Sequence, residues 1–206
     1  MAENGKKPEF KDLVQDLPDE LKQFKIRARK EIQELINDRK FNDVIEKGRE
    51  ALAKLPDKAV GVGDKGISDI FLMTATAIRE LQGNTEEVRN MAMKAAEFDR
   101  TSKGAMWLVR DLRNEKSSES KFYLMECTGK SFAPTTEGIK EFPFKTVYGV
   151  VADNPEEAMN YVREFERGEV SSSMELRDAK EVEEKTDVPK GVYSTMALVA
   201  KFKTKE

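Results

Sequence analysis

The stretch that decides the fold is FNDVIEKGREALAKLP, residues 41–56. Its apolar and small residues recur at steps of three and four, which is the period of one face of an α-helix. They are Phe41, Val44, Ile45, Gly48, Ala51, Leu52 and Leu55. Proline cannot continue a helix, so Pro56 ends the run. The stretch therefore predicts an amphipathic helix, and the small residue in the middle of its apolar face lets a neighbouring helix come close.

The same period appears in the segments on either side of this stretch. It predicts further helices over residues 20–37, 67–81, 88–98 and 105–112, joined by short connections. The hydroxyls of Thr101 and Ser102 suit the N-cap of the last of these helices. Helices separated by short turns pack as antiparallel hairpins, so we expect an array of helical hairpins in this half of the chain.

Two parts of this array resemble the tetratricopeptide repeat. RKFNDV (39–44) leading to EALAKLP (50–56) is similar to the second helix of that repeat, and GNTEEV (83–88) leading to KAAEFD (94–99) repeats the pattern. The copies lie 44 residues apart instead of about 34, because of an insertion around residues 60–66. The resemblance covers roughly residues 31–112 and lacks the Trp and Gly of the first helix. It implies stacked helix pairs whose concave side binds protein segments.

The pattern changes after residue 115. Residues 116–120 are polar and predict a linker, whereas 121–128 and 145–152 are short β-branched or aromatic runs typical of strands. A helix is expected to start at Asp153-Asn154-Pro155 and to end before Gly168. A third strand should contain Met174, Leu176 and Val182. Residues 191–202, apolar at nearly every position, predict a fourth and central strand.

These patterns together predict an α+β protein of two domains. An N-terminal segment (1–18) should precede an antiparallel α-helical, tetratricopeptide-like array (19–115). The linker (116–120) should lead to a small ββαββ sandwich (121–206) with one helix on a mainly antiparallel sheet. Two repeats are too few for a free-standing solenoid, so we expect the array to lean on the other domain or on the N-terminal segment.

Composition excludes several function classes. Residues 1–115 include 22 basic and 22 acidic residues and residues 116–206 include 14 and 17, so neither part has the positive field that nucleic-acid binding requires. The sequence contains no histidine, which excludes histidine triads and histidine metal sites. A single cysteine, Cys127, permits no intramolecular disulfide. The charged start of the chain has no apolar run, so we expect a cytoplasmic protein without membrane insertion.

Four motif-like features do not meet the structural requirements of their chemistry. GVGDKG (61–66) matches a dinucleotide-binding glycine pattern but follows a helix instead of a strand, and it is interpreted as an interhelical loop. TGKS (128–131) resembles the end of a P-loop, yet position 124 is leucine and residues 132–134 cannot begin a helix. The carboxylates within residues 156–184 are interpreted as part of a solvated surface and not as a metal site. Cys127 lies in an apolar strand-like run, which predicts a buried and unreactive thiol. We expect no catalytic residue, cofactor or metal.

Two segments are expected to contact a partner. The N-terminal segment has an amphipathic pattern, and residues 129–144, which contain three exposed-looking apolar residues, are too long for a tight hairpin and predict a loop. The candidate residues are Phe10, Leu13, Leu17, Phe132, Ile139 and Phe142. The function expected is a non-catalytic adaptor or scaffold for protein partners, in which the second domain docks another surface or dimerises through its sheet edge. The alternatives are a structural or accessory subunit of a large assembly, such as a phage particle, and a histidine-independent enzyme.

Overall fold

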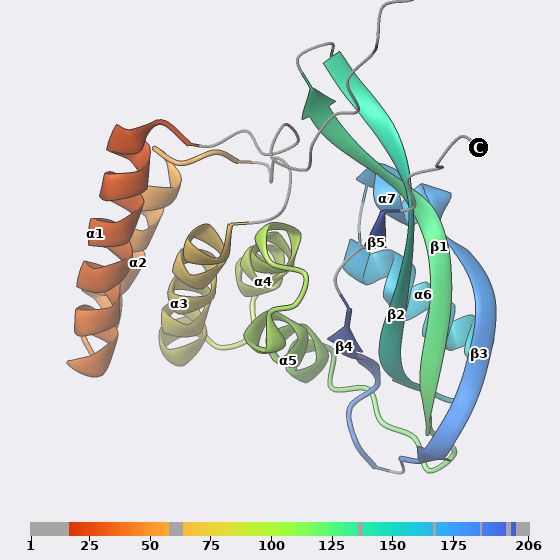
Figure 1. Ribbon diagram of the computed structural model, residues 1–206. Coiled ribbons are helices and arrows are strands. Elements are labelled where there is room, and N and C mark those ends of the chain that lie inside the picture. Colours follow the sequence, from red (N-terminus) through yellow and green to blue (C-terminus); the bar gives the residue numbers. More distant parts are fainter. Residues whose placement is uncertain are drawn as a thin grey trace, which may run out of the picture.

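The first half of the chain folds into five helices laid side by side (Figure 1). The computed structural model describes residues 17–57, 64–135, 138–166, 168–185, 187–196 and 199–200. Consecutive helices contact one another, and the first also contacts the third. All five predicted helices are confirmed. They are α1 (Asp19–Asn37), α2 (Phe41–Leu52), α3 (Lys65–Gln82), α4 (Glu86–Phe98) and α5 (Lys103–Arg113).

Side-chain caps and one glycine explain where these helices begin and how closely they pack. Asp64, Thr85 and Ser102 each accept a hydrogen bond from a backbone N–H in the first turn of α3, α4 and α5. At Gly48 of α2, an added Cβ would lie 2.0 Å from the Thr74 hydroxyl oxygen of α3. The predicted close approach at position 48 is therefore confirmed.

The second half of the chain is an antiparallel sheet with the strand order β3-β1-β2-β4, to which a short β5 adds by pairing with β2. Two helices, α6 and α7, follow the first two strands. The predicted α+β fold is confirmed, and the structure adds the short α7. The elements are β1 (Lys121–Thr135), β2 (Gly138–Ala152), α6 (Pro155–Glu166), α7 (Gly168–Ser173), β3 (Glu175–Glu184), β4 (Gly191–Thr195) and β5 (Val199–Ala200).

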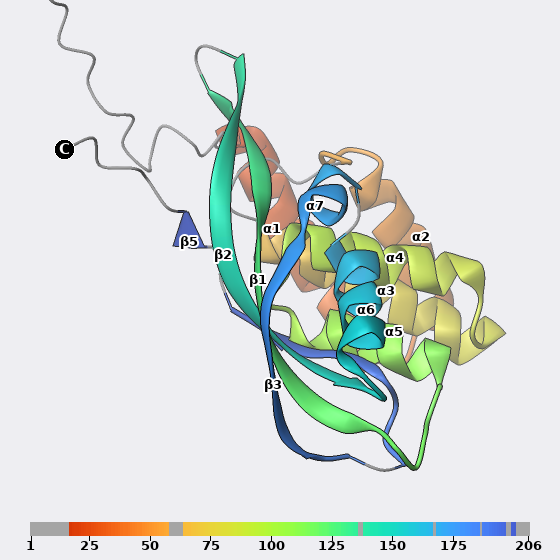
Figure 2. The same ribbon diagram turned by 90° about the vertical axis from the view of Figure 1, so that its right-hand side faces the viewer.

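Both α6 and the helical array lie on the same side of the sheet (Figure 2). The pleat of β1 reflects this arrangement, because Tyr123, Met125 and Cys127 face the helices and are buried. Leu124, on the opposite side of the pleat, is 39% exposed. One face of the sheet is therefore core and the other is solvent-facing.

The helical array and the sheet share one packed boundary, the seam, formed where α4 and α5 meet α6 and β4. Four residues of the array belong to the apolar cluster of the sheet: Ala95, Ala96, Ala105 and Met106. The segment predicted as a linker is irregular and is hydrogen-bonded to the connection between β3 and β4. Its Ser117 and Ser120 carbonyls accept hydrogen bonds from the backbone N–H groups of Asp187 and Lys185, at 3.2 and 2.8 Å.

Two details of the predicted second domain are wrong. Residues 129–144 are not a loop, because β1 and β2 remain paired from Gly129 opposite Phe144 as far as Thr135 opposite Gly138. The fourth strand is not central, because β4 stands at the end of the strand order and, among the described strands, pairs with β2 alone. Its apolar character comes from contacts at the seam, where Val192 is 5% exposed.

Candidate functional site

The end of the β1–β2 hairpin forms the β-arm, residues 130–135 and 138–143. It projects beyond the rest of the sheet and beyond the helices in both views (Figures 1 and 2). Within the part of the chain that the structure describes, β1 pairs with β3 as far as Thr128 opposite Glu175, and β2 pairs with β5 as far as Phe144 opposite Ala200. Among the described residues, no third strand pairs with the β-arm.

The base of the β-arm is anchored to α7. The backbone N–H of Lys130 donates to the Ser173 hydroxyl at 2.8 Å, and that hydroxyl donates back to the Lys130 carbonyl at 3.2 Å. An added Cβ on Gly129 would lie 2.8 Å from the Phe144 ring, so the glycine allows the strands to pack closely here. An ion pair between Lys130 and Glu141 at 3.1 Å joins the two strands. The arm therefore leaves the sheet in a fixed direction.

The structure places the predicted contact residues at different positions. Phe132 stands opposite Glu141 and Ile139 opposite Pro134, so these two positions alternate onto the same face of the ribbon. Phe142 stands opposite Ser131, on the other face, and is half-buried. Of the N-terminal candidates, Leu17 packs against the apolar cluster of the array. Phe10 and Leu13 lie outside the described residues.

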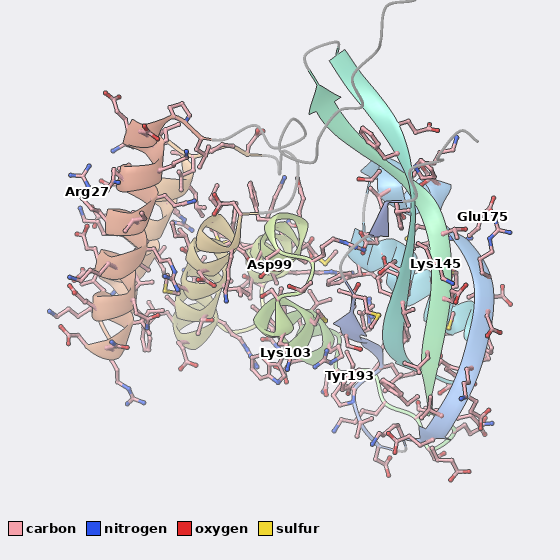
Figure 3. The ribbon with its side chains drawn as sticks, viewed as in Figure 1. Arg27, Asp99, Lys103, Lys145, Glu175 and Tyr193 are labelled. Carbon is pink, nitrogen blue, oxygen red and sulfur yellow. The ribbon has the colours of Figure 1, made fainter. Side chains whose placement is uncertain are left out.

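At the seam, arginines of the helical array bond to α6. Arg89 of α4 and Arg113 of α5 each bond to one oxygen of Glu164 through Nη2. Arg110 donates to the Val192 carbonyl and stacks on the Tyr193 ring at 3.7 Å. Figure 3 shows Tyr193 between α5 and the sheet. These charge-assisted contacts hold the array against the sheet.

A buried polar cluster lies around Arg100, at the turn between α4 and α5. Arg100 bonds to Glu166 and to the Tyr148 hydroxyl at 2.6 Å, and that hydroxyl lies 2.7 Å from Glu166. The side chain of Glu166 is 7% exposed. Burial raises the pKa of Tyr148, and the neighbouring Glu166 carboxylate raises it further, so the phenol remains a neutral donor. The cluster joins α4, β2 and α6.

Acidic groups gather around Tyr161 and Lys190 next to the seam arginines, where the Arg113 guanidinium stacks on the Tyr161 ring at 4.3 Å and its Nε lies 3.9 Å from Glu115. The Tyr161 hydroxyl lies 2.8 Å from Glu115 and 3.0 Å from Glu157. Lys190 Nζ lies 2.8 Å from Glu157 and 2.9 Å from Asp153. The hydrogen bond from Lys190 lowers the pKa of Asp153, whereas burial, and then the two carboxylates, raise the pKa of Tyr161.

A cavity of about 420 Å³ opens beside the seam arginines Arg89 and Arg113 and beside Tyr161. Its walls come from α4, α5, the segment after α5, and α6. They are formed by Arg89, Val109, Leu112, Arg113, Glu115, Tyr161 and Glu164. Sequence periodicity does not indicate this site, because its members come from segments far apart in the chain and its charged members are single residues on α4, α5, the segment after α5, and α6.

An exposed tryptophan lies on the array, away from the seam. Trp107 of α5 is 52% exposed, and the Arg79 guanidinium of α3 stacks on its ring at 5.1 Å. Arg79 also pairs with Asp111, one turn further along α5. Tryptophan and arginine are enriched at the centres of protein interfaces. An exposed tryptophan cannot be told from a buried one by its position in the sequence alone.

The features judged inert in the sequence have structural explanations. Cys127 is buried, and desolvation raises the pKa of its thiol to about 11. Residues 128–131 run straight through β1, so no helix follows them as a P-loop would require. Asp64, within the glycine-rich segment, caps α3, and residues 58–63 lie outside the described part of the chain. The described residues contain no cluster of three or more potential metal-ligating side chains.

Comparison with known proteins adds no family or function. No family model, no curated protein and no solved structure matches the chain. None of the described helices is both long enough and apolar enough to cross a membrane.

Proposed function

We propose that this chain is a non-catalytic protein-interaction module and that the β-arm is its principal partner-binding element. The observation that supports the proposal is the projection of a two-stranded ribbon beyond the sheet, without a third strand from the described residues. Two strands alone are marginally stable in water. A partner that covers the ribbon would bury its apolar residues and stabilise it.

The β-arm is a better contact element than the free edge of the sheet. The edge strand β3 is exposed at nearly every position and rich in charged residues, and its register with β1 shifts twice. Charges and bulges on an edge strand oppose edge-to-edge pairing. The base of the arm is fixed by Ser173, and positions 132 and 139 lie on the same face of its ribbon.

The helical array would supply a second contact surface around Trp107. Its ring is exposed in a chain whose other large aromatic side chains are mostly covered. The stacked Arg79 and its pairing with Asp111 hold the neighbouring polar groups in place. This surface fits the expectation from the tetratricopeptide resemblance that the array contacts protein segments.

Shortening the β-arm tests the proposal. Residues 132–141 are replaced by a two-residue Asn-Gly turn, which suits a hairpin closed at Ser131 and Phe142. In the described part of the chain the replaced strand residues pair only with each other, so the shortened protein should keep its α-helical circular dichroism signal and a cooperative unfolding transition. Lys103→Ser, an exposed change at the start of α5, is the matched control.

Both variants and the parent are purified from the native cell at natural expression, and co-purifying proteins are quantified by mass spectrometry. The proposal expects one or a few partners with the parent and the control, and their loss from the shortened protein. Retention of every partner by the shortened protein would contradict it. A single partner at equal stoichiometry would favour the subunit of a large assembly, and substoichiometric clients would favour the adaptor.

A further inference from the structure

The outer edge of β2 continues past its neighbouring strands into the β-arm. Of the strands that the structure describes, β4 and β5 pair with this edge, and their last pair toward the arm is Phe144 opposite Ala200. Figure 2 shows β5 beside β2 at this point. Beyond Phe144, β2 runs on through the arm as far as Gly138. This part of the edge has room for one more strand.

The backbone of β2 is oriented for pairing along this edge. The Met196 N–H donates to the Val147 carbonyl at 3.0 Å, so the backbone groups of Val147 point away from β1. Successive residues of an antiparallel strand point these groups to alternate edges, and β1 and β2 stay in register through the whole arm. The N–H and carbonyl groups of Ile139 and Glu141 therefore point to the outer edge.

The base of the arm gives the same orientation independently. The Lys130 N–H donates to the Ser173 hydroxyl of α7, so it points away from β2. Lys130 stands opposite Pro143, and two residues directly opposite in an antiparallel pair point either toward each other or both away. The backbone of Pro143 therefore faces the outer edge. A proline there removes no hydrogen bond between β1 and β2.

The register of β5 carries the next residues of the chain along this edge. β5 runs antiparallel to β2 and ends with Ala200 opposite Phe144. Each further residue of the chain moves one residue along β2 toward the tip of the arm. In this register, residues 201–206 stand opposite residues 143–138, which are the β2 half of the arm. No turn is needed, because β5 leads directly into this segment.

The sequence of this segment, KFKTKE (201–206), fits such a strand. It has lysine at every second position, so the pleat of a strand would place all three lysines on one face. In the register of β5, Lys203 stands opposite Glu141, whose exposed carboxylate also pairs with Lys130 at 3.1 Å. Opposite charges directly across a strand pair are stabilising. Lysines are also typical of edge strands, where they oppose further pairing.

We propose that residues 201–206 pair antiparallel with β2 and form the third strand of the β-arm. Ile139 and Glu141 would each exchange two backbone hydrogen bonds with the residue opposite. Three strands are more stable than two, so the arm would have its shape before a partner binds. The partner would then reach the β1 edge, where the backbone groups of Phe132 point outward. This consequence for binding rests on the proposed function, whereas the pairing itself does not.

Amide hydrogen exchange of the purified full chain, measured for each residue by nuclear magnetic resonance, tests the pairing. The amides of Ile139 and Glu141 should be protected, because each N–H would have an acceptor on the third strand. The Phe132 amide, on the opposite edge of the arm, is the internal control and should exchange rapidly. In a variant that ends at Ala200, the two β2 amides should exchange at least about tenfold faster and the Phe132 amide should be unchanged.

Two proline variants test the register. Lys203→Pro removes the N–H that would donate to the Glu141 carbonyl, so it should abolish the protection of Ile139 and Glu141. Thr204→Pro is the matched control and should keep that protection, because the N–H of residue 204 would point away from β2. The proposal is overturned if both amides exchange as fast as that of Phe132 in the full chain, or if Lys203→Pro keeps their protection. Protection that increases with protein concentration would also overturn it, because a second copy would then occupy the edge.

These results are distinguishable from the test of the proposed function, because hydrogen exchange is measured without a partner. Protected amides, together with retention of every partner by the shortened protein, would reject the partner-binding role and keep the third strand. Unprotected amides, together with loss of the partners on shortening, would reject the third strand and keep the partner-binding role.

Discussion

Replacing Arg100 by methionine should destabilise the protein strongly, because it leaves Glu166 buried without its cation. The Glu166 side chain is 7% exposed, and the Arg100 side chain is 19% exposed. Removing one partner of a buried ion pair costs about 3–5 kcal/mol. The Nε and Nη1 atoms of Arg100 are buried without an acceptor, so methionine also removes an existing penalty of about 1–3 kcal/mol. We expect a net loss of about 2–3 kcal/mol in the free energy of unfolding.

The companion variant separates charge from packing. In Arg100→Met combined with Glu166→Met, no buried charge is left unpaired, so the free energy of unfolding should return to within about 1 kcal/mol of the parent.

Urea unfolding followed by Trp107 fluorescence and by far-ultraviolet circular dichroism measures both variants. The fluorescence reports on α5 and the dichroism on the whole chain, so coincident transitions show that the array and the sheet unfold together. A single variant within about 0.5 kcal/mol of the parent, or a double variant less stable than the single, would refute the reasoning about this ion pair.

Three further outcomes are expected. Gly48→Ala should lower the free energy of unfolding by about 1–3 kcal/mol in thermal denaturation, because its Cβ would overlap Thr74; an unchanged melting temperature would contradict this packing. Cys127 should resist a thiol-specific maleimide in native buffer and react once unfolded, because it is buried and the pKa of its thiol is raised to about 11; rapid native labelling would contradict its burial. Asp153→Asn should lower the free energy of unfolding by about 1 kcal/mol at neutral pH, as measured by urea unfolding. The hydrogen bond from Lys190 lowers the pKa of Asp153, so the native carboxylate stabilises the fold above its ordinary pKa and loses that effect as the pH falls through its native pKa. The difference in the free energy of unfolding between parent and variant should therefore vanish in acid. A difference that does not depend on pH would contradict the assignment.

The helices could be predicted because each has its own apolar period and its own stop signal. α2 ends at Leu52, four residues before the predicted stop at Pro56, and the Ser102 cap marks the start of α5. The seam could not be predicted in the same way. Arg89, Arg113 and Glu164 are single charged residues on three helices, and their meeting depends on tertiary packing, which a period does not encode.

The sequence of the β-arm predicts a loop because its prolines and glycines are typical of interruptions in regular secondary structure. In a two-stranded ribbon both strands are edges, so a proline is tolerated wherever its missing N–H would have pointed away from the partner strand. Pro134 and Pro143 therefore fit opposite Ile139 and Lys130. The apolar residues of this segment nevertheless predict a contact element, because they have no obvious place in a core.

The predicted central position of the fourth strand is wrong for a related reason. Apolar residues on both faces of a strand usually mean that it is central in a sheet. In β4 they mean that the strand lies against α5. Val192 is buried there, and Tyr193 packs between Arg110 and Phe122. A strand at the end of a sheet and beneath a helix has the same sequence signature as a central strand.

Site-specific photo-crosslinking in the native cell tests the partner-binding role of the β-arm most directly. A photoreactive amino acid is placed at position 132 or 139 of the arm, and at Glu46 on the exposed side of α2 as the control. The account predicts that both arm positions crosslink to the same protein and that position 46 does not. Crosslinks of equal yield from all three positions, or none from the arm, would contradict it.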